Sequence, residues 1–131
     1  MEWGVGMAAK SSDLLQQASK VEELCSALLA LPDPLNERQQ EAVGDVMQAL
    51  NLFTGRVVDL ADIIENHLDQ IHSVSHRLRT PLVTIQDYPE RLLMGLYGTL
   101  TAPQENIAEQ LDESASQLSV LVTELFKSAT H

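Results

Sequence analysis

The 131-residue chain is poor in aromatic side chains, in basic side chains and in cysteine. Phenylalanine, tyrosine and tryptophan make up only 4% of the sequence, whereas leucine, alanine, glutamine and glutamate are plentiful. This composition favours helices that pack through aliphatic side chains over a β-sandwich. No apolar run approaches the roughly 20 residues that cross a bilayer, and no basic region precedes an apolar core as in a secretory signal. We therefore expect no membrane partner.

Basic residues are scarce, with eight lysines and arginines against nineteen acidic residues and a net charge of −11. Such a charge argues against nucleic acid and anionic membranes as main partners. Cys25 is the only cysteine, so no intrachain disulfide can form, and a reducing cytoplasm is predicted. Three of the few basic residues cluster within fifteen positions of the chain: Arg77, Arg79 and Arg91.

The amino-terminal part predicts a loose tail followed by a helix. Residues 1–12 contain two glycines and show no periodicity, whereas Asp13 with Gln16 forms a capping signature at a helix start. The helix is predicted to stop at the Pro32-Asp33-Pro34 triplet, because proline cannot continue a helical turn. Its apolar positions recur at helical spacing: Leu14, Ala18, Val21, Leu24, Cys25, Leu28 and Leu31.

The middle of the chain predicts one very long helix, which opens at the capping signature of Asn36 and Gln39. Apolar residues then follow a heptad pattern, in steps of three and four: Val43, Val46, Leu50, Phe53, Val57, Leu60, Ile64, His67, Ile71, Val74, Leu78, Pro81 and Ile85. The spacing predicts a continuous helix to about Asp87, on the order of 75 Å long. Further apolar residues flank this seam and widen it, as a four-helix bundle requires: Leu52, Val58, Ile63, Leu68 and Leu82.

Prolines and a glycine turn end the long helix. Pro81 predicts a kink near Leu78, and Pro89 predicts an end between residues 87 and 93. A turn at residues 95–99 precedes a last helix, which opens at Thr101 and Gln104. The apolar positions of this last helix are Ile107, Leu111, Ala115, Leu118, Leu121, Val122 and Leu125.

The predicted fold is all-α. It consists of a helical hairpin that forms a dimeric four-helix bundle, with a long first helix and an extra amino-terminal helix. We divide the chain into a flexible tail (1–12), an amino-terminal helical extension (13–56) and a dimerising hairpin domain (57–131).

The heptad pattern separates the histidines. His67 falls on the seam, where a core or interface role is expected, and His76 lies opposite the seam, facing solvent. His72 precedes His76 by one helical turn, the spacing of a metal-binding pair. However, no glutamate lies between the two histidines as in the zinc-protease helix, and no third ligand is evident, so a zinc site is the weaker interpretation.

The string Ser75-His76-Arg77-Leu78-Arg79-Thr80-Pro81-Leu82 resembles the phosphoacceptor box of sensor histidine kinases. In that family, the histidine is followed by an acidic, an apolar and a basic residue, then threonine and proline. The resemblance extends through residues 83–88, the turn at residues 95–101 and the second helix from Gln104 to Phe126. It covers roughly the last half of the chain and implies a dimerisation and histidine-phosphotransfer domain.

The resemblance implies a role for each residue of the box. His76 would be the phosphoacceptor, an exposed imidazole on a rigid helix that attacks a phosphoryl group in line. Arg79 would offset phosphoryl charge, Thr80 would orient water during dephosphorylation of a response regulator, and Pro81 would loosen the helix. The implied partners are a second copy of the chain, the receiver domain of a response regulator, and an ATP-binding kinase domain in cis or in trans.

Two features depart from the family pattern. Arg77 stands where the family has Glu or Asp, and arginine cannot accept the proton that the attacking imidazole gives up. The sequence given also stops at His131 without a nucleotide-binding motif, so we expect no cofactor bound by this chain, and ATP would require a separate ATP-binding domain. The chain alone is therefore not expected to be a complete kinase.

Two alternatives remain from the sequence. The chain could be a non-catalytic scaffold, adaptor or kinase inhibitor that keeps the dimer and the docking surface, which Arg77 favours. It could also be a structural coiled coil, although that interpretation leaves the phosphoacceptor-like box and the turn unexplained.

Overall fold

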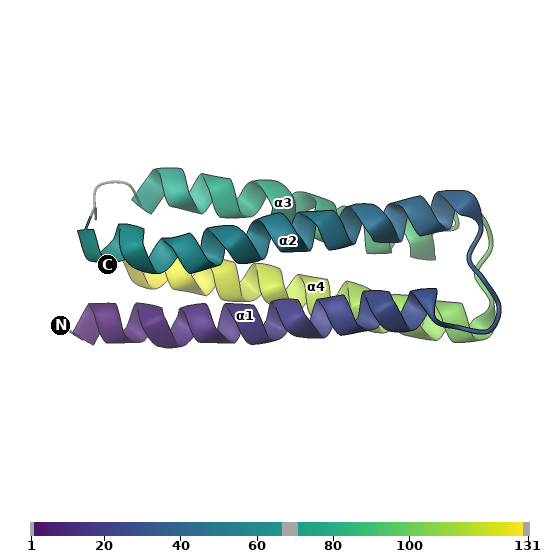
Figure 1. Ribbon diagram of the computed structural model, residues 1–131, viewed down its shortest axis with the longest axis horizontal. Coiled ribbons are helices and arrows are strands. Elements are labelled where there is room, and N and C mark those ends of the chain that lie inside the picture. The colour runs from purple at the N-terminus through teal and green to yellow at the C-terminus, as the bar shows by residue number, and fades with distance from the viewer. Residues whose placement is uncertain (1, 67–70, 130–131) are drawn as a thin grey trace.

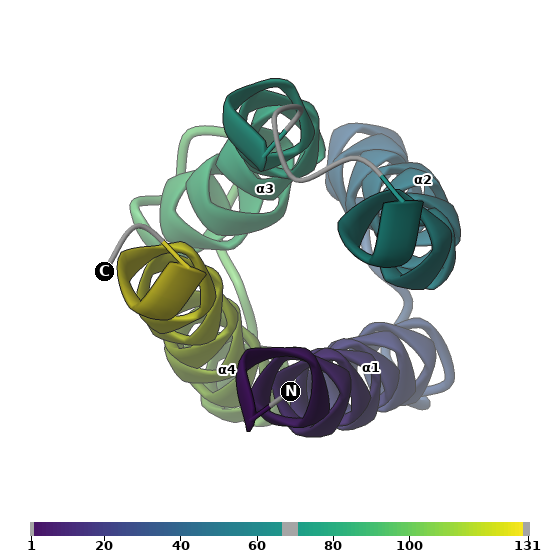
Figure 2. The same cartoon turned by 90° about the vertical axis from the view of Figure 1, so that its left-hand side faces the viewer.

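In the part of the chain that the structure describes, four helices form an up-down-up-down bundle (Figure 1). The computed structural model describes residues 2–66 and 71–129, and the side chains of residues 12–59 and 73–126. The helices are α1 (Glu2–Leu29), α2 (Glu37–Asn66), α3 (Ile71–Leu93) and α4 (Ala102–Ala129). Each helix packs against two neighbours, so that α1, α2, α3 and α4 form a ring (Figure 2). The all-α class and the helical hairpin of α3 and α4 are confirmed. In the described part of the chain, no helix is long and apolar enough to span a membrane.

The core of the ring is built from the predicted apolar stripes. The seam positions of α2 and α3 whose side chains are described are all buried: Val43, Val46, Leu50, Phe53, Val57, Val74, Leu78, Pro81 and Ile85. Leu82 is also buried, but the other described flanking residues, Leu52 and Val58, are 48% and 60% exposed. The prediction that these two residues widen the seam was wrong, because each helix of the ring buries only the stripe that faces its two neighbours.

The single long helix predicted from Asn36 to Asp87 is instead two antiparallel helices. Helix α2 ends at Asn66, α3 begins at Ile71, and the two pack side by side (Figure 1). An uninterrupted rod cannot bury its own seam, whereas folding back lets both halves of the seam face the same core. Neither proline nor glycine marks this reversal in the sequence. The seam positions Leu60, Ile64, His67 and Ile71 lie outside the side chains that the structure describes.

The expected tail and the expected domain boundary also differ from the structure. Helix α1 begins at Glu2, so the prediction of a loose tail at residues 1–12 was wrong, and Asp13 lies inside the helix rather than at its start. Gly4 and Gly6 each lower the stability of a helix by about 1 kcal/mol relative to alanine. A helix that is already formed and packed can nevertheless extend through them, because each added residue gains a hydrogen bond. The boundary predicted between residues 56 and 57 falls within α2.

Two capping boxes tie the hairpins together at one end of the bundle. At the start of α2, the Gln39 N–H donates to Asn36 Oδ1 (2.8 Å), and the Asn36 N–H donates to Gln39 Oε1 (2.9 Å). The Thr101 and Gln104 pair repeats this arrangement at α4, with distances of 3.3 and 2.9 Å. The capping boxes predicted at Asn36 and at Thr101 are therefore confirmed, whereas the one predicted at Asp13 is not, because α1 begins at Glu2.

Each of these glutamines also crosses to the opposite loop. The buried Gln39 amide donates to the Thr99 carbonyl oxygen (3.3 Å), and the buried Gln104 amide donates to the Asp33 carbonyl oxygen (2.9 Å). The Asn36 side chain adds a bond to the Tyr97 carbonyl oxygen (2.7 Å). The loops of the two hairpins are thus joined to each other as well as to their own helices.

Cys25 belongs to the core of α1 and is fully buried. Burial raises the pKa of its thiol to about 12, and the nearby Glu22 carboxylate adds to the increase. The thiol therefore stays protonated at neutral pH, in line with the structural role of a small apolar side chain.

The loop contacts make Gly98 the more sensitive of the two turn glycines. Gly98 has φ +121° and Gly95 has φ +77°, but a Cβ on Gly98 would lie 2.5 Å from Asn36 Nδ2, whereas a Cβ on Gly95 would meet only the Gly98 carbonyl oxygen, at 4.0 Å. We expect Gly98→Ala to lower the free energy of unfolding by about 2 kcal/mol or more, and Gly95→Ala by about 1 kcal/mol. Urea unfolding of both variants measures this, and equal losses would contradict the account.

Candidate functional site

His76 lies in the first half of α3 and is exposed to solvent. The residues around it alternate between core and surface, with Val74 and Leu78 buried in the ring and Arg77 and Arg79 exposed. The burial of Val74 and Leu78 fixes the rotation of α3, so the imidazole must project outward. The outward orientation predicted from the heptad pattern is confirmed.

Pro81 leaves an unpaired backbone carbonyl next to His76. Proline has no N–H, so the carbonyl oxygen four residues earlier, that of Arg77, lacks its partner within the helix. A side chain of the neighbouring helix compensates, because Arg56 Nη1 of α2 donates a hydrogen bond to the Arg77 carbonyl oxygen. Arg56 thus connects α2 to the backbone of α3 at the residue that follows His76. The kink that Pro81 predicts stays a prediction.

Thr80 lies one turn after His76 on the same surface. Its hydroxyl donates to the carbonyl oxygen of His76 at 3.0 Å. This bond holds the hydroxyl proton on the helix backbone and leaves the oxygen lone pairs directed to solvent, where they can accept a hydrogen bond from water. The suggested role of Thr80 in orienting water stays a prediction.

The three arginines that cluster in the sequence do not act as one group in space. Arg77 and Arg79 are exposed on the same turn as His76, whereas Arg91 lies about 22 Å farther along α3 at the rise of a helix. There its guanidinium stacks on Tyr88 at 5.4 Å from the ring centroid, and Tyr88 stacks on Tyr97 at 6.2 Å. Arg91 therefore belongs to the loop end of the bundle, and a hydrogen bond to Tyr97 raises its pKa.

A narrow groove between α2 and α3 lies beside the site, lined by Arg56, Asp59, Val74 and Arg77. Sequence reasoning missed Arg56 and Asp59, because a continuous helix would place Arg56 about 30 Å from His76. Only the fold-back of α3 on α2 brings them together. The result is a cationic edge next to an exposed imidazole on a chain with net charge −11. Such an edge suits a transient phosphoryl group better than a metal ion.

His67 and His72 are the two other histidines of this region. The side chains of His67 and His72 lie outside the described residues, and so does the suggested metal pair of His72 with His76.

Comparison with known proteins matches this half of the chain to one family. Residues 66–130 match the His Kinase A (phospho-acceptor) domain. The chain is also similar to the "Sensor protein SrrB" of Staphylococcus aureus strains N315 and NCTC 8325, with 39% identity over 82 residues. That alignment covers 58% of this chain and 14% of each relative. No solved structure matches.

The contact between Arg56 and the Arg77 carbonyl oxygen predicts a measurable loss of stability. Arg56→Met keeps most of the apolar stem but removes the donor, and we expect the free energy of unfolding to fall by about 1 kcal/mol, because water can replace the donor at this exposed carbonyl. Arg79→Met, which also removes one exposed charge, is the matched control and should change stability by less than about 0.5 kcal/mol. Equal stabilities in urea unfolding would show that the contact is not formed in solution.

Proposed function

Residues 66–130 of this chain belong to the His Kinase A family of phospho-acceptor domains, and we propose that His76 is the acceptor that passes a phosphoryl group to a response regulator. The family's domain is a helical hairpin that dimerises and serves two-component histidine kinases. The observation that carries the proposal is the position of His76. Its side chain is exposed, although the core residues before and after it in α3, Val74 and Leu78, are buried. It also lies beside cationic side chains.

The proposed function consists of two successive phosphoryl transfers. In the first, an imidazole nitrogen of His76 attacks the terminal phosphorus of ATP, a P–N bond forms, the bond to the ADP oxygen breaks and the ring loses a proton. In the second, a carboxylate of the receiver domain attacks the phosphorus, the P–N bond breaks and the imidazole regains a proton. An ATP-binding domain, in cis or in trans, would supply the nucleotide.

Charge near the imidazole supports acceptance of a phosphoryl group. Arg77 and Arg79 follow His76 on the same exposed turn, and Arg56 reaches the adjacent backbone from α2. A phosphoryl group carries negative charge that guanidinium groups stabilise through charge-assisted hydrogen bonds. We assign Arg79 and Arg77 to this electrostatic role and Thr80 to the orientation of water.

The partners of the proposal are the receiver domain of a response regulator and the ATP-binding domain. Domains of this family dimerise, and the homodimer expected from the heptad pattern stays a prediction for this chain. The reducing, cytoplasmic location also stays a prediction. Because the chain spans about 14% of the length of the curated relatives it matches, the activity of the whole protein belongs to the proposal as well.

Arg77 favours a second candidate function, a non-catalytic adaptor or kinase inhibitor that docks a receiver domain without accepting phosphate. An arginine cannot take the proton that the imidazole loses, so the first transfer must rely on another base. The two functions differ in one observable, the formation of phosphohistidine.

His76→Gln tests the proposal directly. The wild-type chain is incubated with the ATP-binding domain of a histidine kinase and labelled ATP, or with a phosphorylated receiver domain. We expect an acid-labile label that His76→Gln abolishes and that the matched control His72→Gln retains. Receiver binding without any label in the wild type would overturn the phosphoacceptor and favour the adaptor.

Arg77→Glu restores the acidic residue that the family has after its histidine. We expect the initial rate of labelling from ATP to rise at least about 10-fold, because general-base assistance typically contributes 10²–10⁴-fold. Arg79→Glu makes the same change in charge two residues farther on and should not increase the rate. Equal rates for wild type and Arg77→Glu would show that this position does not limit the transfer.

A further inference from the structure

The two hairpins of the ring share one pattern of buried positions. In α1 and α3, the buried residues stand 64 positions apart: Leu14 and Leu78, Ala18 and Leu82, Val21 and Ile85, Cys25 and Pro89, Leu28 and Leu92. In α2 and α4, they stand 65 positions apart: Val43 and Ala108, Val46 and Leu111, Leu50 and Ala115, Phe53 and Leu118, Val57 and Val122. The extra position corresponds to the connecting loop, which spans residues 30–36 in the first hairpin and residues 94–101 in the second.

The loop end repeats in the same way. The capping residues Asn36 and Gln39 stand 65 positions before Thr101 and Gln104. The contacts between the loops are reciprocal, since the buried glutamine of each hairpin donates to a backbone carbonyl in the loop of the other. Burial, caps and cross-contacts therefore relate the hairpins as two protomers of a symmetric bundle are related.

We propose that the α1–α2 hairpin takes the place of the second phosphoacceptor hairpin, so that one chain closes a bundle that its family closes with two chains. The ring supports this proposal, because α3 and α4 bury their apolar stripes against α2 and α1 and against each other (Figure 2). A second copy of the chain would have to displace α1 and α2 to reach those stripes. On this inference, one chain forms the whole bundle and a homodimer is not required.

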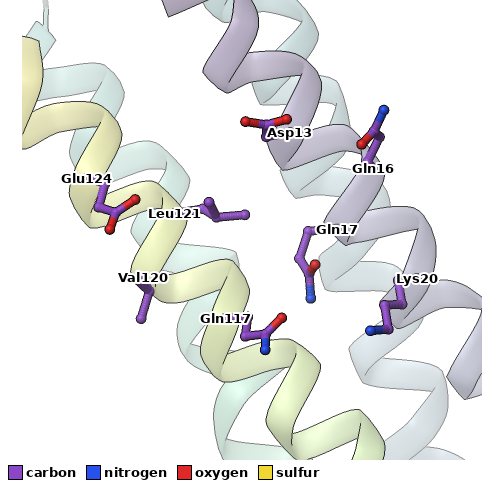
Figure 3. A pocket seen from close by; sticks show the side chains of 8 residues that line it. All are labelled: Asp13, Gln16, Gln17, Lys20, Gln117, Val120, Leu121 and Glu124. Atoms are coloured by element: carbon purple, nitrogen blue, oxygen red, sulfur yellow. The ribbon is translucent and has the colours of Figure 1, made fainter.

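The same repeat relates two unequal grooves, which lie on opposite sides of the ring. The α2–α3 groove lies beside His76, and the α1–α4 groove is lined by Asp13, Gln16, Gln17, Lys20, Gln117, Val120, Leu121 and Glu124 (Figure 3). The two linings occupy equivalent positions of the repeat: Arg77 and Asp13, Arg56 and Leu121, Asp59 and Glu124. The position equivalent to His76 is Ser12, which is exposed.

The second groove contains neither histidine nor arginine among its described lining residues. Its volume is about 670 Å³, and Figure 3 shows Gln17 and Gln117 extending toward each other between the two helices. The Gln17 amide donates to the carbonyl oxygen of Ser114 on α4 at 3.0 Å. Asp13 replaces the arginine of the first groove, so the electrostatic field there disfavours a phosphoryl group. The bundle thus has one acceptor face, on α2 and α3, for one receiver domain.

The mass of the full chain in solution tests this arrangement. Light scattering after size-exclusion chromatography, over a wide range of protein concentrations, should give 14.4 kDa throughout. A mass of twice that value at all concentrations would overturn the inference. This test does not depend on the proposed phosphotransfer.

A disulfide between α1 and α4 tests the closure of the ring within one chain. Gln17→Cys with Ser114→Cys places a thiol pair where the two helices already contact each other, and each single variant is a control. After mild oxidation, denaturing electrophoresis without reductant should give a cross-linked band of single-chain mass. A cross-linked band of twice that mass would show that α1 pairs with α4 of another chain.

A third experiment, which rests on the proposed function, counts the phosphoryl groups carried by each bundle. Native mass spectrometry of the labelled protein should find at most one phosphoryl group per bundle, whereas two on one assembly would contradict the single acceptor face. If no label forms at all, the proposed function fails, while the solution mass and the cross-link still decide the architecture.

Discussion

Burial of one apolar stripe along α3 determines where the chemistry of this bundle can occur. Leu78 and Ile85 are fully buried between α2 and α4, and Val74 is almost so. Rotating α3 to bring His76 inward would expose these side chains, at a cost of about 1.5–3 kcal/mol for each one. The imidazole is therefore held on the outer surface by core packing rather than by contacts of its own.

The same stripe requires partners, and the chain provides them by folding back twice. Helix α2 covers one side of α3, and α4, returning from the glycine turn, covers the other. Closing the ring then brings the α1–α2 hairpin opposite the α3–α4 hairpin, and the crossed bonds of Gln39 and Gln104 join the two loops. Arg56 reaches the segment around His76 only because of this arrangement, and its bond to the Arg77 carbonyl oxygen compensates for the N–H that Pro81 lacks.

Patterns within each helix predicted much of this structure, but they did not predict where the chain reverses direction or which helices pack together. Helical periodicity predicted most of the buried positions and the outward orientation of His76, and side-chain chemistry predicted the capping boxes of α2 and α4. The reversal between Asn66 and Ile71 could not be predicted, because the heptad pattern runs through it without a breaking residue and fits a continuous rod equally well. That single error placed Arg56 far from the site and left the α1–α2 hairpin unrecognised.

The internal repeat was within reach of the sequence. The two capping signatures, at Asn36 and at Thr101, are followed by apolar residues at the same spacing, and comparing them would have indicated two similar hairpins. The role of Arg56 has no such signal, since it depends on which carbonyl the neighbouring helix presents.

The central claim is that the exposed imidazole of His76 receives the phosphoryl group. The most direct measurement is fragmentation mass spectrometry of the labelled wild-type chain, kept at neutral pH so that the P–N bond survives. The account predicts the phosphoryl group on His76 alone. A phosphoryl group on His67, His72 or a hydroxyl side chain, with His76 unmodified, would contradict it.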